Sequence, residues 1–380
     1  MRLERLVVRD LRCIRELDLD PGPNWNLILG PNGAGKTSLL EAAFLLSHGR
    51  SFRAGARAAL TRNGTTGYSV FGEFRDGAGV SHRVGLERAG KVLVSHVGGS
   101  PVALGVLLAE ARVLCFEPGS HLLVSGAADE RRRFMDWGVF HVERGLLELW
   151  RRFQRGLRQR NAALRAADSI RDEGIDSWTH DLASTGEALS DLRSRWLERF
   201  ADPVARHLER LTGIRSPVEV RFDRGWPSEH GLFEAMSAAL ERDLERGHTS
   251  VGPHRADWSL ELPGQPAWRQ LSRGQEKLVA LACTLAQAEV VASSEQDWPV
   301  LCIDDLGSEL DDRHQRRVIE VLAATPAQLL IAGTHVPQGV ERARDRLSVF
   351  HVEQGQLVNR YNGMVSTTPE SAAKLSQERP

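Results

Sequence analysis

Apolar residues along the N-terminal stretch are spaced as in short strands. They cluster at positions 3–8, recur at Leu11, Ile14, Leu17 and Leu19, and fill most of residues 25–29. Strands of half-buried or fully buried sheets show such short apolar segments, whereas helices need longer runs with a period near 3.6. We therefore predict an opening pair of strands that leads into a buried strand at 25–29.

The pattern becomes helical at residues 38–46 and then returns to strands. Three apolar runs at 68–74, 80–86 and 91–97 are separated by the turn pairs Asp76-Gly77 and Ala89-Gly90. Runs of this kind between turn residues predict a small antiparallel sheet. A further strand is predicted at 112–116.

The central part of the chain is mainly helical, from about residue 127 to 246, with one strand-like interruption at 218–222. Alternation of strands and helices resumes at Asp257 and continues to about Tyr361. We therefore predict an α/β head with mixed sheets around its first helix, built from residues 1–120 and 250–361. A mainly helical lobe at 121–249 is inserted between these parts. The small and polar residues 362–380 are expected to be disordered.

Composition places the chain among ordinary globular proteins. It has 380 residues, a formal net charge of −1 and 26% charged residues, so any nucleic-acid binding needs a local basic patch. The N-terminal segment carries charges and lacks a signal-peptide core, and we identify no membrane-spanning run. We expect a soluble, cytoplasmic protein with no membrane partner. Four scattered cysteines are expected to be small buried apolar residues: Cys13, Cys115, Cys283 and Cys302.

The segment between the 25–29 strand and the 38–46 helix carries the strongest chemical signal. It fits the phosphate-loop pattern, in which two glycines separated by four residues are followed by Lys36 and Thr37. The glycines let backbone N–H groups surround a phosphate, the lysine adds a positive charge, and the threonine offers a hydroxyl to Mg²⁺. A glycine-rich turn that binds nothing is the alternative, but the strand–loop–helix order favours a nucleoside triphosphate, ATP. The predicted contacts are Gly30, Pro31, Asn32, Gly33, Ala34, Gly35, Lys36, Thr37 and Ser38.

A second site element follows the apolar run at 298–303, which ends in Asp304 and Asp305. A buried strand that ends in two carboxylates suits ATP hydrolysis, with Asp304 in the magnesium shell and Asp305 orienting a water. The alternative is a strand that simply ends in acidic turn residues. A phosphate loop in the same chain favours the ATPase interpretation, in which Lys36 also takes part in catalysis.

A third element is Ser272-Arg273-Gly274-Gln275, directly before an apolar helix at 277–291. Ser272 is a good N-cap, and the N–H groups at the start of this helix can bind an anion. Taken alone, this segment is better explained as an ordinary capped helix, because caps of this kind are common.

The order of these elements resembles the ATP-binding-cassette ATPase superfamily. The resemblance implies that Ser272, Gly274 and Gln275 of one subunit cap the ATP held by a second copy. It implies that Ser308 and Asp311 lie along the seam of this dimer, and that His335 senses the γ-phosphate. A solvent-facing or structural histidine is the alternative for His335.

Further segments resemble the RecF family of bacterial recombination mediators over nearly the whole ordered chain. They are residues 49–53 (GRSFR), 116–118 (FEP), 131–136 (RRRFMD) and 252–255 (GPHR) with Asp257. The resemblance implies an ATP-dependent dimer that binds DNA without sequence preference and acts in DNA repair, replication and the SOS response. With RecR and RecO, such a protein directs RecA loading at gapped or damaged DNA.

Two departures from the superfamily pattern affect the expected chemistry. Most of its members carry Glu where this chain has Asp305, whose side chain is one methylene shorter, so slow hydrolysis is expected. No glutamine is identified for the loop that usually links magnesium to the helical lobe, although Glu117 lies in that region.

Arginines in the helical part could contact DNA. Arg144, Arg151, Arg158 and Arg165 recur every seven residues, and Arg155 joins them. A basic stripe of this kind can bind the phosphate backbone. The alternative is a solvated helix face that pairs with nearby acidic residues (Glu143, Glu148, Asp168). The candidate DNA contacts are Arg131, Arg132, Arg133, Arg151, Arg155 and Arg158.

Three other functions remain open from the sequence. They are a transporter's nucleotide-binding subunit, an ATPase module of a nuclease or defence complex, and a scaffold with a vestigial site. An SMC-type head with a very long coiled coil does not fit, because much of the segment between Lys36 and Ser272 is predicted sheet.

Overall fold

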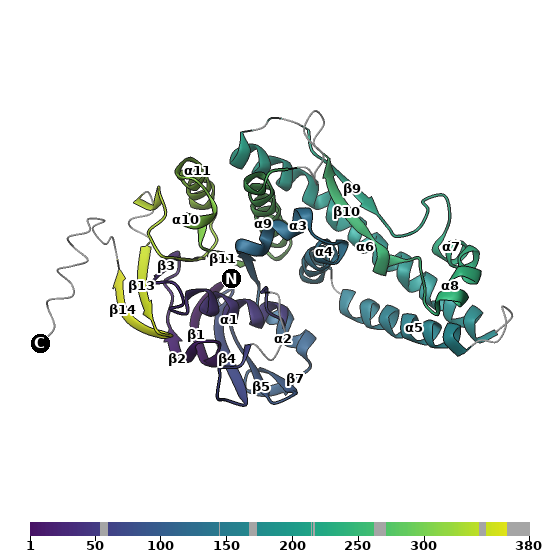
Figure 1. Cartoon of the computed structure of the whole chain (residues 1–380), viewed down its shortest axis with the longest axis horizontal. Coiled ribbons are helices and arrows are strands. Elements are labelled where there is room, and N and C mark those ends of the chain that lie inside the picture. Colours follow the sequence, from purple (N-terminus) through teal and green to yellow (C-terminus); the bar gives the residue numbers. More distant parts are fainter. Residues whose placement is uncertain are drawn as a thin grey trace, which may run out of the picture. The chain divides into compact units, whose positions relative to one another are not determined.

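The computed structural model describes residues 1–53, 60–143, 145–166, 173–213, 215, 217–261, 271–341 and 347–362. The chain forms two compact units (Figure 1). Unit 1 combines residues 1–119 with residues 297–380, and unit 2 comprises residues 120–296. A head built from both chain ends, with a mainly helical insertion, is thus observed as predicted. Of the predicted disordered tail at 362–380, Asn362 is instead the last residue of a strand, and residues 363–380 lie outside the described residues.

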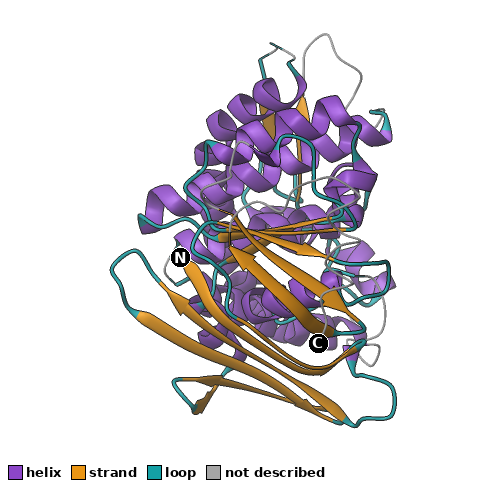
Figure 2. Cartoon of the chain, turned by 90° about the vertical axis from the view of Figure 1, so that its left-hand side faces the viewer, coloured by secondary structure: helices purple, strands orange, loops and turns teal. Residues whose placement is uncertain are grey.

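Unit 1 contains a six-stranded antiparallel sheet in the order β2-β1-β4-β5-β6-β7. Its strands are drawn, like every strand, as orange arrows in Figure 2. They are β1 (Arg2–Leu11), β2 (Ile14–Leu19), β4 (Gly67–Arg75), β5 (Ser81–Ala89), β6 (Val92–Val97) and β7 (Ser100–Val102). Helix α2 (Leu104–Glu110) follows the last strand. The predicted strand pair and antiparallel sheet are confirmed.

The second sheet of unit 1 is mixed and has the order β14-β13-β3-β12-β11-β8. The pairs β13–β3, β3–β12, β12–β11 and β11–β8 are parallel, and β13–β14 is antiparallel. Its strands are β3 (Trp25–Leu29), β8 (Val113–Phe116), β11 (Val300–Asp304), β12 (Leu329–Gly333), β13 (Leu347–Glu353) and β14 (Gln356–Asn362). The helices of this part are α1 (Lys36–His48), α10 (Leu306–Glu309) and α11 (Asp312–Ala323).

Helix α1 forms part of the apolar core of unit 1. Its side chains are buried almost all round, as expected of a helix enclosed by other elements. The same core includes Leu6 of the antiparallel sheet and Ile28 and Leu330 of the mixed sheet. Gln328 joins the two sheet regions, since its Oε1 accepts the N–H of Leu3 at 2.7 Å and its Nε2 donates to the oxygen of Leu3 at 3.0 Å. The helix that follows the phosphate loop is therefore held in a rigid surrounding.

Unit 2 is mainly helical and contains one two-stranded antiparallel ribbon, β9–β10. The short helix η2 (Pro118–His121) lies where the chain passes from unit 1 to unit 2. The further elements are α3 (Leu122–Ser125), α4 (Ala128–Val142), α5 (Leu146–Ala166), α6 (Glu173–Thr212), β9 (Glu219–Asp223), α7 (Leu232–Ala238), α8 (Leu240–Arg246), η3 (Pro253–Arg255), β10 (Asp257–Glu261) and α9 (Arg273–Glu295).

The chain returns to unit 1 at a later residue than the sequence predicted. Residues 250–296 belong to unit 2, and unit 1 resumes at Asp297 rather than near residue 250. The reason is pairing and packing within unit 2. Strand β10 pairs with β9, and α9 binds α4 and α6 through Gln287 Nε2, which donates to Phe134 O at 2.7 Å, and through Glu289, which accepts from His207 at 3.0 Å.

Helix α9 is the one helix in the described part of the chain whose length and composition would allow it to cross a membrane, although the sequence showed us no such run. Of its most apolar stretch, 78% is buried inside the protein. Burial of this kind is typical of the core helix of a unit, and the apolar composition of α9 is explained by its contacts with α6 and α4.

Candidate nucleotide site

The phosphate loop connects buried strand β3 to helix α1, as the sequence predicts. All five residues of β3 are buried between β13 and β12. Gly35 occupies the N-cap of α1 with φ 110°, a left-handed conformation that favours glycine. A Cβ atom on Gly30 would lie 2.1 Å from the carbonyl oxygen of Val352, so a side chain is excluded there. The glycines therefore serve both the turn and its close approach to β13.

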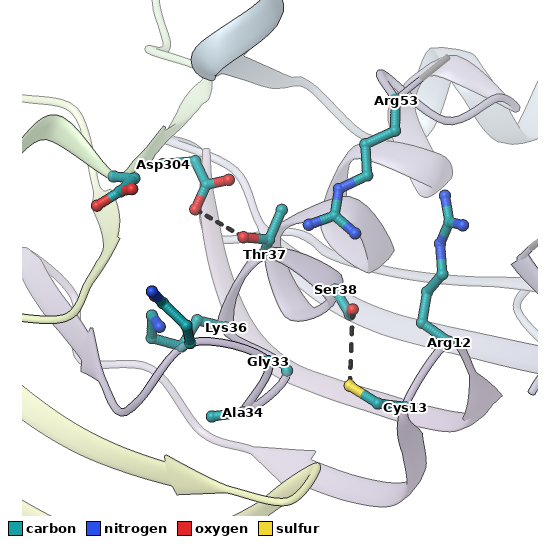
Figure 3. A pocket seen from close by; sticks show the side chains of 12 residues that line it. Arg12, Cys13, Gly33, Ala34, Lys36, Thr37, Ser38, Arg53 and Asp304 are labelled. Atoms are coloured by element: carbon teal, nitrogen blue, oxygen red, sulfur yellow. Dashed lines mark hydrogen bonds between the residues drawn. The ribbon is translucent and has the colours of Figure 1, made fainter. Parts of the chain in front are cut away.

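A cavity of about 320 Å³ lies in front of this loop. Figure 3 shows that Lys36 and Arg53 reach it from different sides. Backbone N–H groups at the start of α1 face the same region, which makes it suitable for an anion. The residues that line the cavity are Arg12, Cys13, Asn32, Gly33, Ala34, Gly35, Lys36, Thr37, Ser38, Arg53, Asp304 and Asp305.

Lys36 lies buried beside the loop, and its Nζ donates to the carbonyl oxygens of Gly30 and Pro31, both at 2.9 Å. Burial lowers the pKa of Lys36, while the nearby carboxylates of Asp305 and Asp304 raise it. An ammonium group with these contacts can exchange carbonyl oxygens for phosphate oxygens. The predicted phosphate-binding role of Lys36 fits this geometry.

Asp304 ends β11 and points toward the start of α1. Its Oδ1 accepts a hydrogen bond from Thr37 Oγ1 at 3.0 Å (Figure 3). Burial raises the pKa of Asp304, and the hydrogen bond from Thr37 and the charge of Arg53 act in the opposite direction. Mg²⁺ that also binds phosphates and waters needs only a few oxygens from the protein. The hydroxyl of Thr37 and the carboxylate of Asp304 can supply them. The described residues hold no cluster of three or more His, Cys, Asp or Glu for a metal held by the protein alone.

Asp305 directly follows β11 and also lines the cavity. Its backbone has φ 52° and ψ 43°, a left-handed conformation that is uncommon outside glycine, and its N–H donates to Ala332 O at 2.9 Å. Strain of this kind is frequent at functional sites. The conformation brings the shorter carboxylate into the cavity, where a water-orienting group is expected.

The cavity also contains three residues to which the sequence assigned no role. Arg12 lies in the β1–β2 turn and binds Glu41 of α1 through two nitrogens, at 3.0 and 2.8 Å. Arg53 reaches the cavity from the segment after α1, and its side chain makes no ion pair or hydrogen bond within the described residues. Cys13 is exposed, 4.0 Å from Ser38 Oγ, so the expectation of a buried cysteine is wrong at this position.

The segment with Ser272 forms the N-terminus of α9 in unit 2. Ser272 Oγ accepts from the N–H of Gln275 at 3.4 Å, and the N–H of Ser272 donates to Gln275 Oε1 at 2.9 Å. Ser272, Gly274 and Gln275 are all exposed. This capping box agrees with the ordinary-helix alternative, and the exposed helix N-terminus also suits an anion from outside the molecule.

The other expected site residues lie outside the cavity lining. Asp311 caps α11, since its Oδ1 accepts the N–H of His314 at 2.9 Å. His335 is exposed, with its Nδ1 2.9 Å from Thr334 Oγ1. The side chain of Ser308 is outside the described part of the chain. Glu117 follows β8, and its Oε2 accepts the N–H of Gly119 at 2.6 Å.

The arginines proposed for DNA contact fall into two groups. Arg131 is 1% exposed and binds Asp257 through two nitrogens, at 2.7 and 2.9 Å, which removes it from the candidate DNA contacts. Arg132 is mostly buried and donates to Ala256 O at 2.5 Å, and Arg133 is paired with Glu130 at 2.7 Å.

The second group lies on one face of α5 and is exposed: Arg151, Arg155 and Arg158. These three make no ion pair or hydrogen bond with any residue that the structure describes. Glu143, an expected partner, lies within 3.8 Å of Arg195 and Arg199 instead. The expected neighbours Arg144 and Asp168 are outside the described residues. The basic stripe on α5 is therefore retained as the candidate.

Comparisons with known proteins agree with the fold described above. A family model for an AAA domain matches residues 5–84. The DNA replication and repair protein RecF of Xanthomonas axonopodis pv. citri is 46% identical over 366 residues, which cover 94% of this chain and 98% of that protein. The chain belongs to the RecF family. The resemblance to RecF seen in the sequence is thereby confirmed.

Solved structures agree on the fold. A structure of the recombination mediator RecF with ATP has a TM-score of 0.84 at 23% identity, covering 95% of this chain and 97% of that one. An Smc head domain from Pyrococcus furiosus has a TM-score of 0.55 at 15% identity and covers 99% of both chains. The predicted fold class, an ABC-type ATPase head with a helical second part, is confirmed for this RecF family member.

Proposed function

We propose that this protein is an ATP-dependent DNA-binding protein of recombinational repair and replication-fork maintenance. The observation that carries the proposal is the combination of a complete phosphate-binding cavity with membership of a family named for DNA replication and repair. The cavity provides glycines, a lysine and two carboxylates at the edge of one sheet, which is what phosphoryl transfer requires.

In this proposal, ATP binds with its phosphates against residues 30–37. The loop N–H groups and Lys36 neutralise phosphate charge, and Thr37 and Asp304 hold Mg²⁺. Bound there, Mg²⁺ would neutralise phosphate charge. Asp305 orients the attacking water and can accept its proton, and Arg53 adds positive charge near Asp304.

Hydrolysis is proposed to be slow, so that ATP acts as a switch. The carboxylate of Asp305 is one methylene shorter than the glutamate usual in this superfamily, which makes the position of the water harder to fix. A misplacement of about 1 Å can reduce the rate of a reaction on the order of a hundredfold.

The switch is proposed to act through a homodimer. Ser272, Gly274 and Gln275 are exposed at the N-terminus of α9, where they can cap the ATP of a second copy. Ser308 and Asp311 are proposed to lie along the dimer seam, with His335 near the γ-phosphate. A ligand that joins two copies stabilises the dimer by its binding free energy.

DNA is proposed to bind without sequence preference, with the basic stripe on α5 as one contact. A solved structure with a similar fold is described as a recombination mediator in the RecFOR pathway. We extend that role to this chain: the ATP-bound dimer, with RecR and RecO, assists RecA loading at gapped DNA.

Light scattering with and without ATP tests the proposal. ATP is expected to double the molar mass of the wild type, while Lys36→Met removes nucleotide binding and dimerisation. Asp305→Asn is expected to keep ATP bound and to hold the dimer. A dimer that forms equally well without nucleotide would contradict the switch. Binding of the ATP form to gapped, duplex and single-stranded DNA, compared with ADP, tests the DNA role.

A further inference from the structure

The buried amide of Gln315 joins the segment that follows Asp305 to the loop that follows His335. Gln315 lies on α11 and is 6% exposed. Its Nε2 donates to Leu310 O at 2.8 Å and to Gly307 O at 3.2 Å, in the segment that follows Asp305. Its Oε1 accepts the N–H of Gln338 at 3.3 Å, in the loop that follows His335.

These contacts satisfy backbone groups that a short helix cannot satisfy by itself. Helix α10 has four residues, and the last four carbonyls of a helix have no intrahelical donor. Leu310 is buried at the end of α10, where loss of a hydrogen-bond partner is costly. The amide of Gln315 is therefore a structural requirement for the position of this segment.

The position of α10 bears directly on Asp305. Asp305 is the N-cap of α10 and has a left-handed backbone, so the direction of its carboxylate depends on where α10 begins. Its N–H donates to Ala332 O, near the end of β12, and β12 leads into the segment with His335. The two loops are thus connected both at Asp305 and at Gln315.

The loop after His335 also rests on α11 by direct contact. Gly339 lies so close to this helix that a Cβ atom would be 3.5 Å from Arg316 Cα and from Ile319 Cγ2. Val340 is buried beside it. Helix α11 therefore supports both loops, and Gln315 is its hydrogen-bonding link to each of them.

We propose that Gln315 is a positioning residue for ATP hydrolysis, which couples the segment after Asp305 to the loop after His335. The inference rests on the proposed ATPase function and adds to it a residue that does not line the nucleotide cavity. A displacement of one loop alters the hydrogen bonds at one end of the Gln315 amide, and the other end transmits the displacement to the second loop. Turnover depends on this link, whereas nucleotide affinity depends on residues 30–37.

Three variants test the hydrogen bonds at the two ends of the Gln315 amide. Gln315→Leu removes all three hydrogen bonds and replaces the amide with an apolar side chain of comparable size. Gln338→Pro removes only the N–H that Gln315 Oε1 accepts. Val340 N donates to Pro337 O at 3.4 Å and Gly339 has φ 96°, which fits a type II turn whose second position, Gln338, favours proline. Gln338→Ala keeps the N–H and is the matched control.

Hydrogen exchange of the full-length protein without nucleotide measures the coupling. In Gln315→Leu, residues 306–310 and 338–340 are both expected to exchange about tenfold faster, while residues 30–38 are unchanged. Gln338→Pro is expected to accelerate exchange in residues 306–310, which it does not touch, and Gln338→Ala leaves both loops as in the wild type. Faster exchange in one loop alone, or equally throughout unit 1, would overturn the proposal.

Steady-state kinetics then measure the consequence for the reaction. In Gln315→Leu, kcat is expected to fall about tenfold or more while the Kd for ATP stays within about twofold. Equal kcat for this variant and the wild type, or equal losses in kcat and in ATP affinity, would overturn the positioning role. Hydrogen exchange does not depend on ATP hydrolysis. A wild-type protein that fails to hydrolyse ATP would therefore contradict the proposed function and leave the coupling through Gln315 to be judged by exchange.

Discussion

Thr37 and Asp304 are 267 positions apart in the sequence and are joined by a hydrogen bond of 3.0 Å. The bond links the start of α1 to the end of β11, and so connects the N-terminal and C-terminal parts of unit 1. Because both groups are oxygen donors of the kind that Mg²⁺ binds, their contact defines where a phosphate-bound metal would lie.

Asp304→Asn is expected to weaken ATP binding mainly when Mg²⁺ is present. The amide keeps an oxygen for Thr37 but removes the charge that attracts the metal. Affinity for ATP with Mg²⁺ is expected to fall about tenfold or more, with little change in EDTA. Isothermal titration of both proteins with and without Mg²⁺ measures this. An equal loss in both conditions would show that Asp304 has no special relation to the metal.

Cys13 is expected to report nucleotide binding by its reactivity. It is exposed at the cavity, whereas Cys283 and Cys302 are buried, and burial raises the pKa of both of these thiols. A maleimide should therefore label Cys13 first. ATP at ten times its Kd should slow this labelling about tenfold, because only the free protein reacts.

Peptide mapping after timed labelling measures the protection, with Cys13→Ser as the control that loses the fast phase. Lys36→Met provides the second control, since ATP should not protect Cys13 when it cannot bind. Labelling of Cys13 that is indifferent to ATP in the wild type would place the nucleotide elsewhere.

The stripe of exposed arginines on α5 is expected to contribute electrostatic DNA binding. Replacing Arg151, Arg155 and Arg158 together by glutamine should weaken binding to all sequences alike. Each lost phosphate contact should reduce the slope of log K against log salt by about one. Fluorescence anisotropy across a salt series measures the slope.

A matched control removes the same charge from another helix. Arg195, Arg199 and Arg206 on α6 are exposed and lie near acidic residues. Their replacement by glutamine should leave the slope almost unchanged. If both triple variants reduce binding equally, net charge rather than the α5 surface would explain the effect.

The stability of unit 2 is expected to fall in mild acid because of His254. Burial lowers the pKa of His254 to about 4, although its hydrogen bond with Thr249 O opposes the shift, and Arg255 and Arg132 add to it. The unfolded chain binds this proton near pH 6.5, so below that pH protonation favours unfolding. The neutral form of His254 therefore contributes its full stabilisation to the folded state above pH 6.5. This stabilisation, on the order of 3 kcal/mol, is lost as the pH falls toward 4.

Urea unfolding between pH 7 and 4.5 measures this dependence. His254→Gln keeps a donor for Thr249 O and removes the titration, so its unfolding free energy should depend less on pH. Burial also lowers the pKa of His207, which leaves a smaller dependence in the variant. Identical pH curves for both proteins would contradict this assignment to His254.

The phosphate loop could be predicted because its requirements are local. Gly30, Gly35, Lys36 and Thr37 follow one another in a fixed pattern, and the apolar run before them identifies β3. The carboxylates at 304–305 could be placed for the same reason. What the sequence did not show is that Arg12 and Arg53 reach the same cavity, since nothing in their spacing indicates the turn that brings them there.

Long-range pairing explains the remaining differences. Arg131 was expected on the surface, but its partner Asp257 is 126 positions away and draws it into unit 2. Cys13 has apolar neighbours, yet Asp10 and Arg12 have φ 51° and 55°, and the turn that they form leaves the cysteine exposed. Helix α9 has an apolar composition that suits either unit, and only its contacts with α4 and α6 decide between them.

The place of β3 within its sheet has a consequence for synthesis on the ribosome. Its two neighbours are β12 and β13, whose residues leave the ribosome long after β3 itself. Until Leu347–Glu353 has emerged, β3 has an open hydrogen-bonding edge and the wall formed by Val352 behind Gly30 does not exist. Unit 2 is complete at residue 296 and can fold during that delay. A truncated chain that ends before β13 should therefore acquire its helical part without gaining the ability to retain a triphosphate.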